Sequence, residues 1–280
     1  MLKKLKAYAL LMRFDKLIGI WLLLWPTLWG LWAAADGFPP ISILIIFLLG
    51  TVMMRAAGCV ANDLADRRFD GDVERTKNRP LINGSVSTKE AFVLLAMLLF
   101  VAFILVLFLN AFAVKLAFVG AFLALIYPFM KRFIHAPQLV LGFAFSWGIP
   151  LAFAAIQNTV PPIAWWLYAA AILWPVAYDT MYAMVDREDD LKIGLKSTAV
   201  WFGKNDCLII AILQAVVWLM LFFYGIVMHM GVMFYVCLLL AGAWYFYMSC
   251  LIKDRSRDNC FKAFKLSHWA GLIIWVGFLL

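Results

Sequence analysis

ISILIIFLLGTVMMRAAGCVANDLADRRFD, residues 41–70, is the stretch that decides the fold. Residues 41–62 carry one charged side chain, Arg55, and about 20 mostly apolar residues suffice for a helix to cross the hydrocarbon core of a bilayer. The apolar run then passes directly into an acidic cluster that begins at Asn62. This stretch therefore predicts a membrane-spanning helix that ends in carboxylates.

The composition of the whole chain agrees with this prediction. Of its 280 residues, 66% are hydrophobic and 14% are charged, which is too apolar for a water-soluble domain of this size. The predicted spans are 17–35, 41–62, 88–109, 112–129, 137–156, 162–183, 207–229, 232–252 and 263–280. The last of these is short, so eight spans is the alternative. We expect one all-α, polytopic membrane domain over residues 1–280.

The basic residues predict which side of the membrane each connection occupies. Lys and Arg cluster before residue 17, over 67–89, at 131–132, over 187–204 and over 253–265, whereas the alternate connections near 36–40, 110, 157–161 and 230 carry none. Because basic residues near span ends stay cytoplasmic, the N-terminus and the long loops are predicted to be cytoplasmic. The net charge of +8 thus reflects topology and attraction to anionic lipid headgroups, and no nucleic acid partner is expected.

Two acidic clusters close two of the predicted spans. If each helix continues through its cluster, residues four apart share a face, so Asn62, Asp66 and Asp70 form one ladder, and Asp186 and Asp190 form a second. The two ladders are offset by the same 120 positions, 66 to 186 and 70 to 190. We therefore expect two related halves, about 1–130 and 131–280, around a shared cavity.

Converging carboxylates repel one another and need a cation, and a hard ion such as Mg²⁺ favours carboxylate oxygens and shares itself with substrate phosphates. The plainer interpretation is that the acids face water and neutralise nearby Arg side chains. Two clusters with the same spacing, each closing a span, favour the metal site.

Basic residues in the same loops could hold a diphosphate, because Arg binds phosphate in a bidentate manner and Lys offers a point charge. The candidates are Arg75, Arg79, Lys131 and Arg132. Arg55 lies inside a span, where facing lipid would cost about 2.5–3.5 kcal/mol or more, so it must face a cavity or a partner. Either a structural ion pair or a deeper anion site satisfies this requirement.

These residues resemble the UbiA family of intramembrane prenyltransferases over essentially the whole chain. The family signature NDxxDxxxD stands complete at residues 62–70, and the second signature, DxxxD, stands at 186–190. Further segments resemble the branch of the family that uses 4-hydroxybenzoate in ubiquinone biosynthesis. They are DKLIGIWLLLWPTLW (15–29), NRPL (78–81), YPFMKR (127–132) and YDTMYAMVDREDDLKIGLKST (178–198).

The resemblance implies nine helices around a central cavity capped by catalytic loops on the cytoplasmic side of a bacterial inner membrane. It implies that Asp66, Asp70, Asp186 and Asp190, assisted by Asn62, hold Mg²⁺ against the diphosphate of a polyprenyl donor. The four basic candidates would grip the diphosphate, and Arg55 with Ser146 would hold the carboxylate of the aromatic acid. The product would be a 3-polyprenyl-4-hydroxybenzoate, with Asp186, Asp190 and the released diphosphate as candidate acceptors of the ring proton.

Three alternatives compete with this interpretation. A member of the family could use another acceptor, such as a naphthoate, haem or a chlorophyll precursor, but Arg55 and the branch-like segments favour 4-hydroxybenzoate. A divalent-cation transporter would carry its acids near the bilayer midplane on broken helices, not at the rim. A lipid phosphotransferase would need a run of Asp, Gly, Ala and Arg before its further Asp residues, and that run is missing from the sequence. The length of the donor chain cannot be read, because its tail can leave the cavity sideways into lipid.

Overall fold

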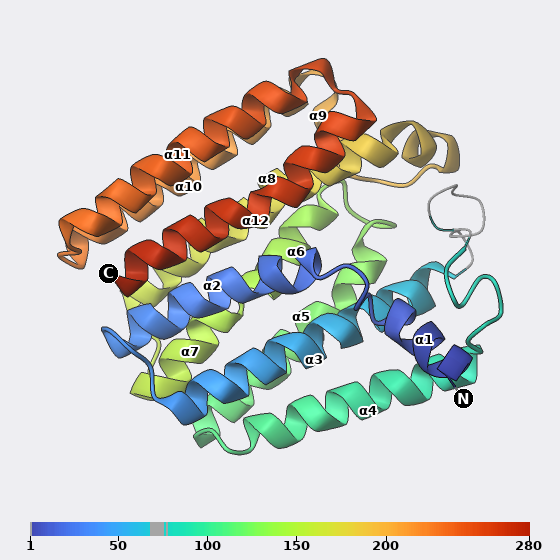
Figure 1. Cartoon of the computed structure of the whole chain (residues 1–280), viewed down its shortest axis with the longest axis horizontal. Coiled ribbons are helices and arrows are strands. Elements are labelled where there is room, and N and C mark those ends of the chain that lie inside the picture. The colour runs from blue at the N-terminus through green and yellow to red at the C-terminus, as the bar shows by residue number, and fades with distance from the viewer. Residues whose placement is uncertain (1, 68–75, 77) are drawn as a thin grey trace.

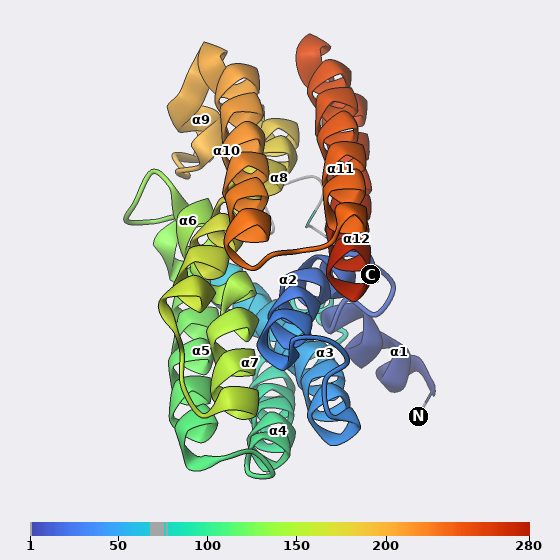
Figure 2. The same cartoon turned by 90° about the vertical axis from the view of Figure 1, so that its left-hand side faces the viewer.

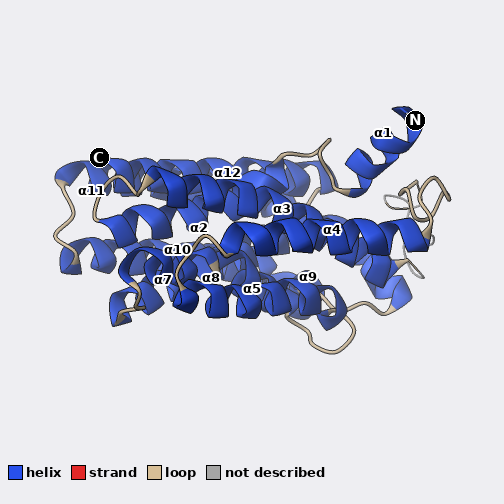
Figure 3. Ribbon diagram, turned by 90° about the horizontal axis from the view of Figure 1, so that it is seen from below, coloured by secondary structure: helices blue, strands red, loops and turns tan. Residues whose placement is uncertain are grey.

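The computed structural model describes residues 2–67, 76 and 78–280, and every regular element within them is a helix (Figure 3). The long helices are α2 (Ile18–Ala35), α3 (Ile41–Asp66), α4 (Thr88–Val106), α5 (Ala111–Met130), α8 (Pro162–Ile193), α10 (Asp206–Val227), α11 (Val232–Leu251) and α12 (Arg257–Leu279). The short ones are α1 (Leu2–Leu11), α6 (Pro137–Ser146), α7 (Gly148–Gln157), α9 (Thr198–Phe202), η1 (Gly203–Asn205) and η2 (Ile252–Asp254). The predicted all-α membrane fold is confirmed.

Each of the nine predicted spans coincides with one long helix or, for 137–156, with the pair α6 and α7. Seven spans within the described residues are long and apolar enough to cross a membrane, and α8 and α12 are not among them. Both helices have a charged turn at one end, and the apolar part of α8 also contains Trp, Tyr and Pro, whose hydropathy is low. The last helix has 23 residues, which give it a length of about 35 Å.

The long helices run side by side and gather the acidic clusters at one end of the bundle (Figure 1). The end of α3, the end of α8 and the start of α12 lie at this end, which we call the motif end, and α1 lies beside it next to the start of α4. Viewed along the bundle, α2 to α7 occupy one side and α9 to α12 the other (Figure 2). Helix α8 runs between these two sets, because it packs against α6 as well as against α10 and α12.

Close helix contacts rely on small residues and on indole hydrogen bonds. A Cβ added to Gly30 would lie 2.7 Å from Cα of Ile149, and one added to Gly142 would lie 2.4 Å from the carbonyl oxygen of Ile172. Within lipid, backbone polar groups need protein partners, and Trp29 donates its indole N–H to the carbonyl of Gly271 at 3.0 Å. These contacts bring α2 against α7 and α12, and α6 against α8.

The predicted span 137–156 is two helices because of one proline. Pro150 has no backbone N–H to donate to the carbonyl of Ser146, so the regular hydrogen-bond ladder is interrupted there. Helix α6 ends at Ser146 and α7 begins at Gly148, with Trp147 between them. The break places Phe145 and Trp147 on the wall of a cavity.

Candidate active site

A cavity of about 1150 Å³ lies within the bundle, lined by residues of α2 to α8 and of α12. This volume is slightly above the 300–1,000 Å³ usual for small-ligand pockets. Apolar and aromatic side chains line its deeper part, among them Phe47, Phe100, Phe103, Phe118 and Leu125, whereas the charged residues of both acidic helices line its motif end. The cavity thus combines a polar mouth with an apolar interior.

The α3 ladder reaches the cavity at the last turn of its helix. Asn62 and Asp66 both line the wall, and Asp66 is 2% exposed. Lys131, at the end of α5, forms an ion pair with Asp66. The third predicted member, Asp70, lies outside the described residues. The structure therefore brings two of the three predicted α3 groups to the cavity.

The α8 ladder lines the same cavity from the opposite side. Asp186 and Asp190 lie on the wall, four residues apart on one helix. Gly194 ends this helix in the left-handed conformation, with φ 71°, and its N–H donates to the carbonyl of Asp190. The predicted meeting of two carboxylate helices over one pocket is what the structure shows.

These groups do not form a closed metal site by themselves. Within residues 2–67, 76 and 78–280, no three His, Cys, Asp or Glu side chains lie close enough together to hold an ion. Mg²⁺ usually keeps several waters and binds through one or two carboxylates together with substrate phosphates. The open set of carboxylate and amide oxygens from Asn62, Asp66, Asp186 and Asp190 fits that mode of binding.

The predicted diphosphate-binding residues separate into two groups. Arg79 and Lys131 line the cavity beside the carboxylates. Arg132 does not line it: its guanidinium lies over the ring of Phe129, 5.6 Å from the centroid, and beside a second, smaller hollow. Arg75 lies outside the described residues. Arg132 is nevertheless close to the α3 ladder, because a nitrogen of its guanidinium lies 4.0 Å from Oδ1 of Asp66.

Asp63 lies off the predicted α3 ladder and is buried among cations. It is 1% exposed and accepts from Arg13 at 2.8 and 3.1 Å, and Arg79 lies 3.0 Å away. This pairing fixes Arg79 at the cavity and ties it to the segment between α1 and α2.

Arg55 lines the cavity deeper than the ladders. It lies seven residues before Asn62 on α3, or about 10 Å farther along the helix. A Cβ added to Gly19 of α2 would lie 2.2 Å from two guanidinium nitrogens, so a larger residue at this position would displace the Arg55 guanidinium. Its terminal nitrogen donates to the sulfur of Cys59 at 2.7 Å. Gly19 gave no sign of this in the sequence, since its importance depends on a residue 36 positions away.

Ser146 is not on the cavity wall. Its side chain is 0% exposed at the end of α6, where Phe145 and Trp147 line the cavity on either side of it. Its hydroxyl has no hydrogen-bond partner among the described residues. The expected contact of Ser146 with the aromatic acid is therefore not supported by its position, because adjacent helical residues point about 100° apart.

Two further polar groups at the depth of Arg55 were not predicted. Tyr127 of α5 and Asp179 of α8 both line the cavity. Tyr127 precedes Lys131 by four residues, so the helical spacing could have identified it.

Comparison with known proteins relates this architecture to a described family. The profile of the UbiA prenyltransferase family matches residues 23–272. A 4-hydroxybenzoate octaprenyltransferase of Saccharophagus degradans is 54% identical over 275 residues, 98% of this chain and 92% of that protein. The protein of the same name from Chromohalobacter salexigens is 53% identical over 279 residues, 100% of this chain and 94% of that protein.

Solved structures share the fold. A UbiA homologue from Aeropyrum pernix superposes with a TM-score of 0.81 at 24% identity, over 92% of this chain and 96% of that one. A UbiA homologue from Archaeoglobus fulgidus, bound to GPP and Mg²⁺, superposes with a TM-score of 0.72 at 19% identity, over 96% and 99%. From its profile match and its near full-length relatives, we conclude that this chain belongs to the UbiA prenyltransferase family.

Proposed function

We propose that this chain transfers a polyprenyl group from polyprenyl diphosphate to the 3-position of 4-hydroxybenzoate, releasing diphosphate, in ubiquinone biosynthesis. The observation that carries the proposal is the meeting of Asp66, Asp186 and Asp190 with Arg79 and Lys131 at the polar mouth of one apolar cavity. The names of the relatives that are more than half identical support 4-hydroxybenzoate as the acceptor.

The polar mouth would hold the diphosphate of the donor. Asn62, Asp66, Asp186 and Asp190, with Asp70 beyond the described residues, would hold Mg²⁺, as the Mg²⁺-bound relative supports. When bound, the ion supplies positive charge that stabilises the departing diphosphate. Arg79 and Lys131 add fixed positive charge at the same place, and Arg75 is proposed to join them. Together these groups lower the free energy of breaking the allylic C–O bond.

The apolar interior would protect the cation that results. Breaking the bond leaves an allylic carbocation and free diphosphate, and water would capture that carbocation before the acceptor could react. Aromatic side chains such as Phe47 and Phe103 line the cavity, exclude water and present ring faces to a cation. The phenol ring then attacks through the carbon ortho to its hydroxyl and loses a proton. The diphosphate, Asp186 and Asp190 are the proton acceptors near the mouth.

Arg55 is proposed to orient the acceptor. Its guanidinium can bind a carboxylate through two parallel hydrogen bonds, and its depth below the ladders separates it from the diphosphate. A carboxylate held there would leave the ring between Arg55 and the mouth, where the carbocation forms. An acceptor without a carboxylate would lose this anchor.

We further propose that the protein lies in the bacterial inner membrane with its motif end on the cytoplasmic side. The support is the distribution of Lys and Arg, which cluster at the N-terminus and in the loops of the motif end. This orientation would give the mouth access to a charged, water-soluble acceptor and to Mg²⁺, while the donor tail remains in lipid.

A product assay by mass spectrometry tests the proposed function. The purified protein receives one polyprenyl diphosphate, Mg²⁺ and a mixture of 4-hydroxybenzoate, benzoate, a hydroxynaphthoate and 4-hydroxybenzyl alcohol. We expect one product, with the mass of prenylated 4-hydroxybenzoate, and none after chelation. Prenylation of 4-hydroxybenzyl alcohol to the same extent as 4-hydroxybenzoate would contradict the role of Arg55. Full activity in the presence of chelator would contradict the proposed mechanism.

A further inference from the structure

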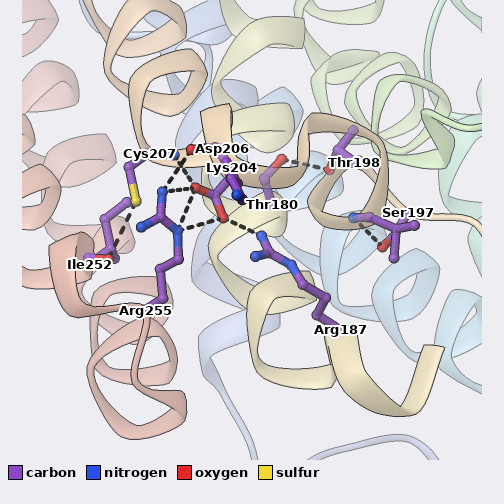
Figure 4. Close-up of polar contacts among 10 residues, drawn as sticks. Thr180, Arg187, Ser197, Thr198, Lys204, Asp206, Cys207, Ile252 and Arg255 are labelled. Atoms are coloured by element: carbon purple, nitrogen blue, oxygen red, sulfur yellow. Dashed lines mark hydrogen bonds and ion pairs between the residues drawn. The ribbon is translucent and has the colours of Figure 1, made fainter. Parts of the chain in front are cut away.

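A buried carboxylate outside the cavity wall is surrounded by cations at the motif end (Figure 4). Asp206, the first residue of α10, is 0% exposed. It accepts from Nε of Arg255 at 3.0 Å and from the N–H of Cys207 at 2.6 Å, and it is paired with the guanidinium of Arg187. Arg255 also donates to the carbonyl of Lys204 at 2.8 Å. Asp206 therefore connects three segments of chain: the end of α8, the start of α10 and the turn before α12.

One of these partners is the immediate neighbour of a ladder residue. Arg187 follows Asp186 on α8, and successive residues of a helix point about 100° apart. Asp186 and Asp190 consequently face the cavity together, whereas Arg187 faces α10 and Asp206. The pair with Asp206 thus holds α8 at a face next to its carboxylate ladder.

The end of α8 is less buried than the rest of the helix. From 185 to 192 every described side chain is half-buried or exposed, whereas Met184 is buried. The apolar contacts that fix the rest of α8 have ended before either ladder residue is reached. Glu188 and Arg257 form an ion pair at 2.8 Å, but their side chains are 75% and 52% exposed, and pairs this exposed contribute little. Arg187, by contrast, pairs with a carboxylate whose side chain is 0% exposed, so this contact can restrain the segment from the side.

We propose that Asp206 is a positioning residue for the prenyl transfer: through Arg187 it holds the end of α8 so that Asp186 and Asp190 face Asp66 across the cavity. The inference rests on the roles given to Asp186 and Asp190 under the proposed function. Asp206 itself does not touch the cavity, so its removal alters the spacing of the two ladders without removing a ligand.

Asp206→Asn tests this role, because it keeps the shape of the side chain and removes its charge. We expect the Mg²⁺ concentration that gives half-maximal activity to rise at least 10-fold, with the KM for 4-hydroxybenzoate unchanged. Arg187→Gln, which breaks the same contact from the other side, should give the same rise, and the double variant should be no worse than either single one. Asp206→Glu should recover part of the loss.

A stability control separates positioning from general loosening of the fold. Asn110 caps α5 and donates to the carbonyls of Ala154 and Ala155 at 2.7 and 3.1 Å, far from the motif end. Asn110→Ala should lower the midpoint of thermal unfolding without moving the Mg²⁺ dependence. A folded Asp206→Asn with the wild-type Mg²⁺ dependence overturns the inference. If that variant does not fold, Arg187→Gln decides the question by the same measurement.

The test also separates this inference from the function on which it rests. Asp186→Asn is measured in the same assay. If it retains full activity, the proposed site itself is wrong. If it is inactive while Asp206→Asn and Arg187→Gln behave as wild type, only the positioning role fails.

Discussion

The ends of α3 and α8 carry the same type of carboxylate ladder but hold it in different ways. On α3 the ladder residue Asp66 is 2% exposed, lies within the bundle and is paired with Lys131 of α5. On α8 the ladder extends beyond the buried residue Met184 and is restrained from a neighbouring face by Arg187. The α3 ladder therefore lies in buried surroundings, whereas the α8 ladder lies on a less buried stretch of helix whose neighbouring residue Arg187 pairs with Asp206.

The two helices also differ deeper in the cavity, where their charges are opposite. Seven residues before Asn62, α3 carries Arg55, and seven residues before Asp186, α8 carries Asp179. Both line the cavity. The offset of 120 residues does not relate Arg55 to Asp179, so this pair of opposite charges breaks the likeness of the two helices and could distinguish the two ends of an asymmetric acceptor.

The largest expected effect comes from removing one carboxylate from each ladder. Asp66→Ala combined with Asp186→Ala should lower kcat by at least about 10³-fold, because loss of one electrostatic contact to a transition state typically costs 10²–10³-fold. Prenyl transfer measured by mass spectrometry at saturating Mg²⁺ checks this. Retained activity in the double variant would mean that the ladders do not hold the metal.

Arg55→Ala tests the difference in charge between α3 and α8 in the deeper part of the cavity. Loss of a charge-assisted hydrogen bond costs about 1.5–3 kcal/mol, which corresponds to a rise of roughly 10- to 100-fold in the KM for 4-hydroxybenzoate. The KM for the polyprenyl diphosphate should stay within about twofold, because Arg55 lies about 10 Å from the ladder. An effect confined to the diphosphate would place Arg55 in the donor site instead.

Lys131→Met tests the way in which α3 holds its ladder. The substitution keeps most of the side-chain volume and removes the cation paired with Asp66, whose side chain is 3% exposed, whereas that of Lys131 is 25% exposed. Breaking a fully buried pair costs about 3–5 kcal/mol, and we expect about 2 kcal/mol here because Lys131 is partly solvated. The free energy of unfolding in detergent should fall by this amount, and kcat by about 10-fold. Unchanged stability would show that other groups, not Lys131, hold Asp66.

The sequence predicted well what depends on helical period and on composition. The nine spans followed from apolar stretches, and the shared face of Asp186 and Asp190 followed from their spacing. The relation between two halves of the chain stays a prediction, as do the roles of Asp70 and Arg75, which lie outside the described residues.

Contacts between distant segments could not be predicted in the same way. The burial of Asp63 between two arginines, the space that Gly19 leaves for Arg55, and the contact of Arg187 with Asp206 all join residues from different helices. Sequence spacing gives the direction of a side chain on its own helix but not the neighbour it meets. Ser146 illustrates the reverse error, since its position in a cavity-lining stretch did not place its side chain on the wall.

The smallest expected effect comes from Gly194→Ala, which changes the backbone at the end of α8 and leaves the carboxylates of both ladders in place. Gly194 ends α8 with φ 71° and satisfies the carbonyl of Asp190, and a residue with a Cβ costs about 1–2 kcal/mol in this conformation. Gly194→Ala should therefore loosen the last turn of α8 and raise the half-saturating Mg²⁺ concentration about two- to fivefold, with little change in kcat at saturation. The matched control is Gly37→Ala, which strains a glycine with φ 136° at the other end of the bundle and should leave the Mg²⁺ dependence unchanged. If both variants behave alike, the end of α8 is held more firmly than its few contacts indicate.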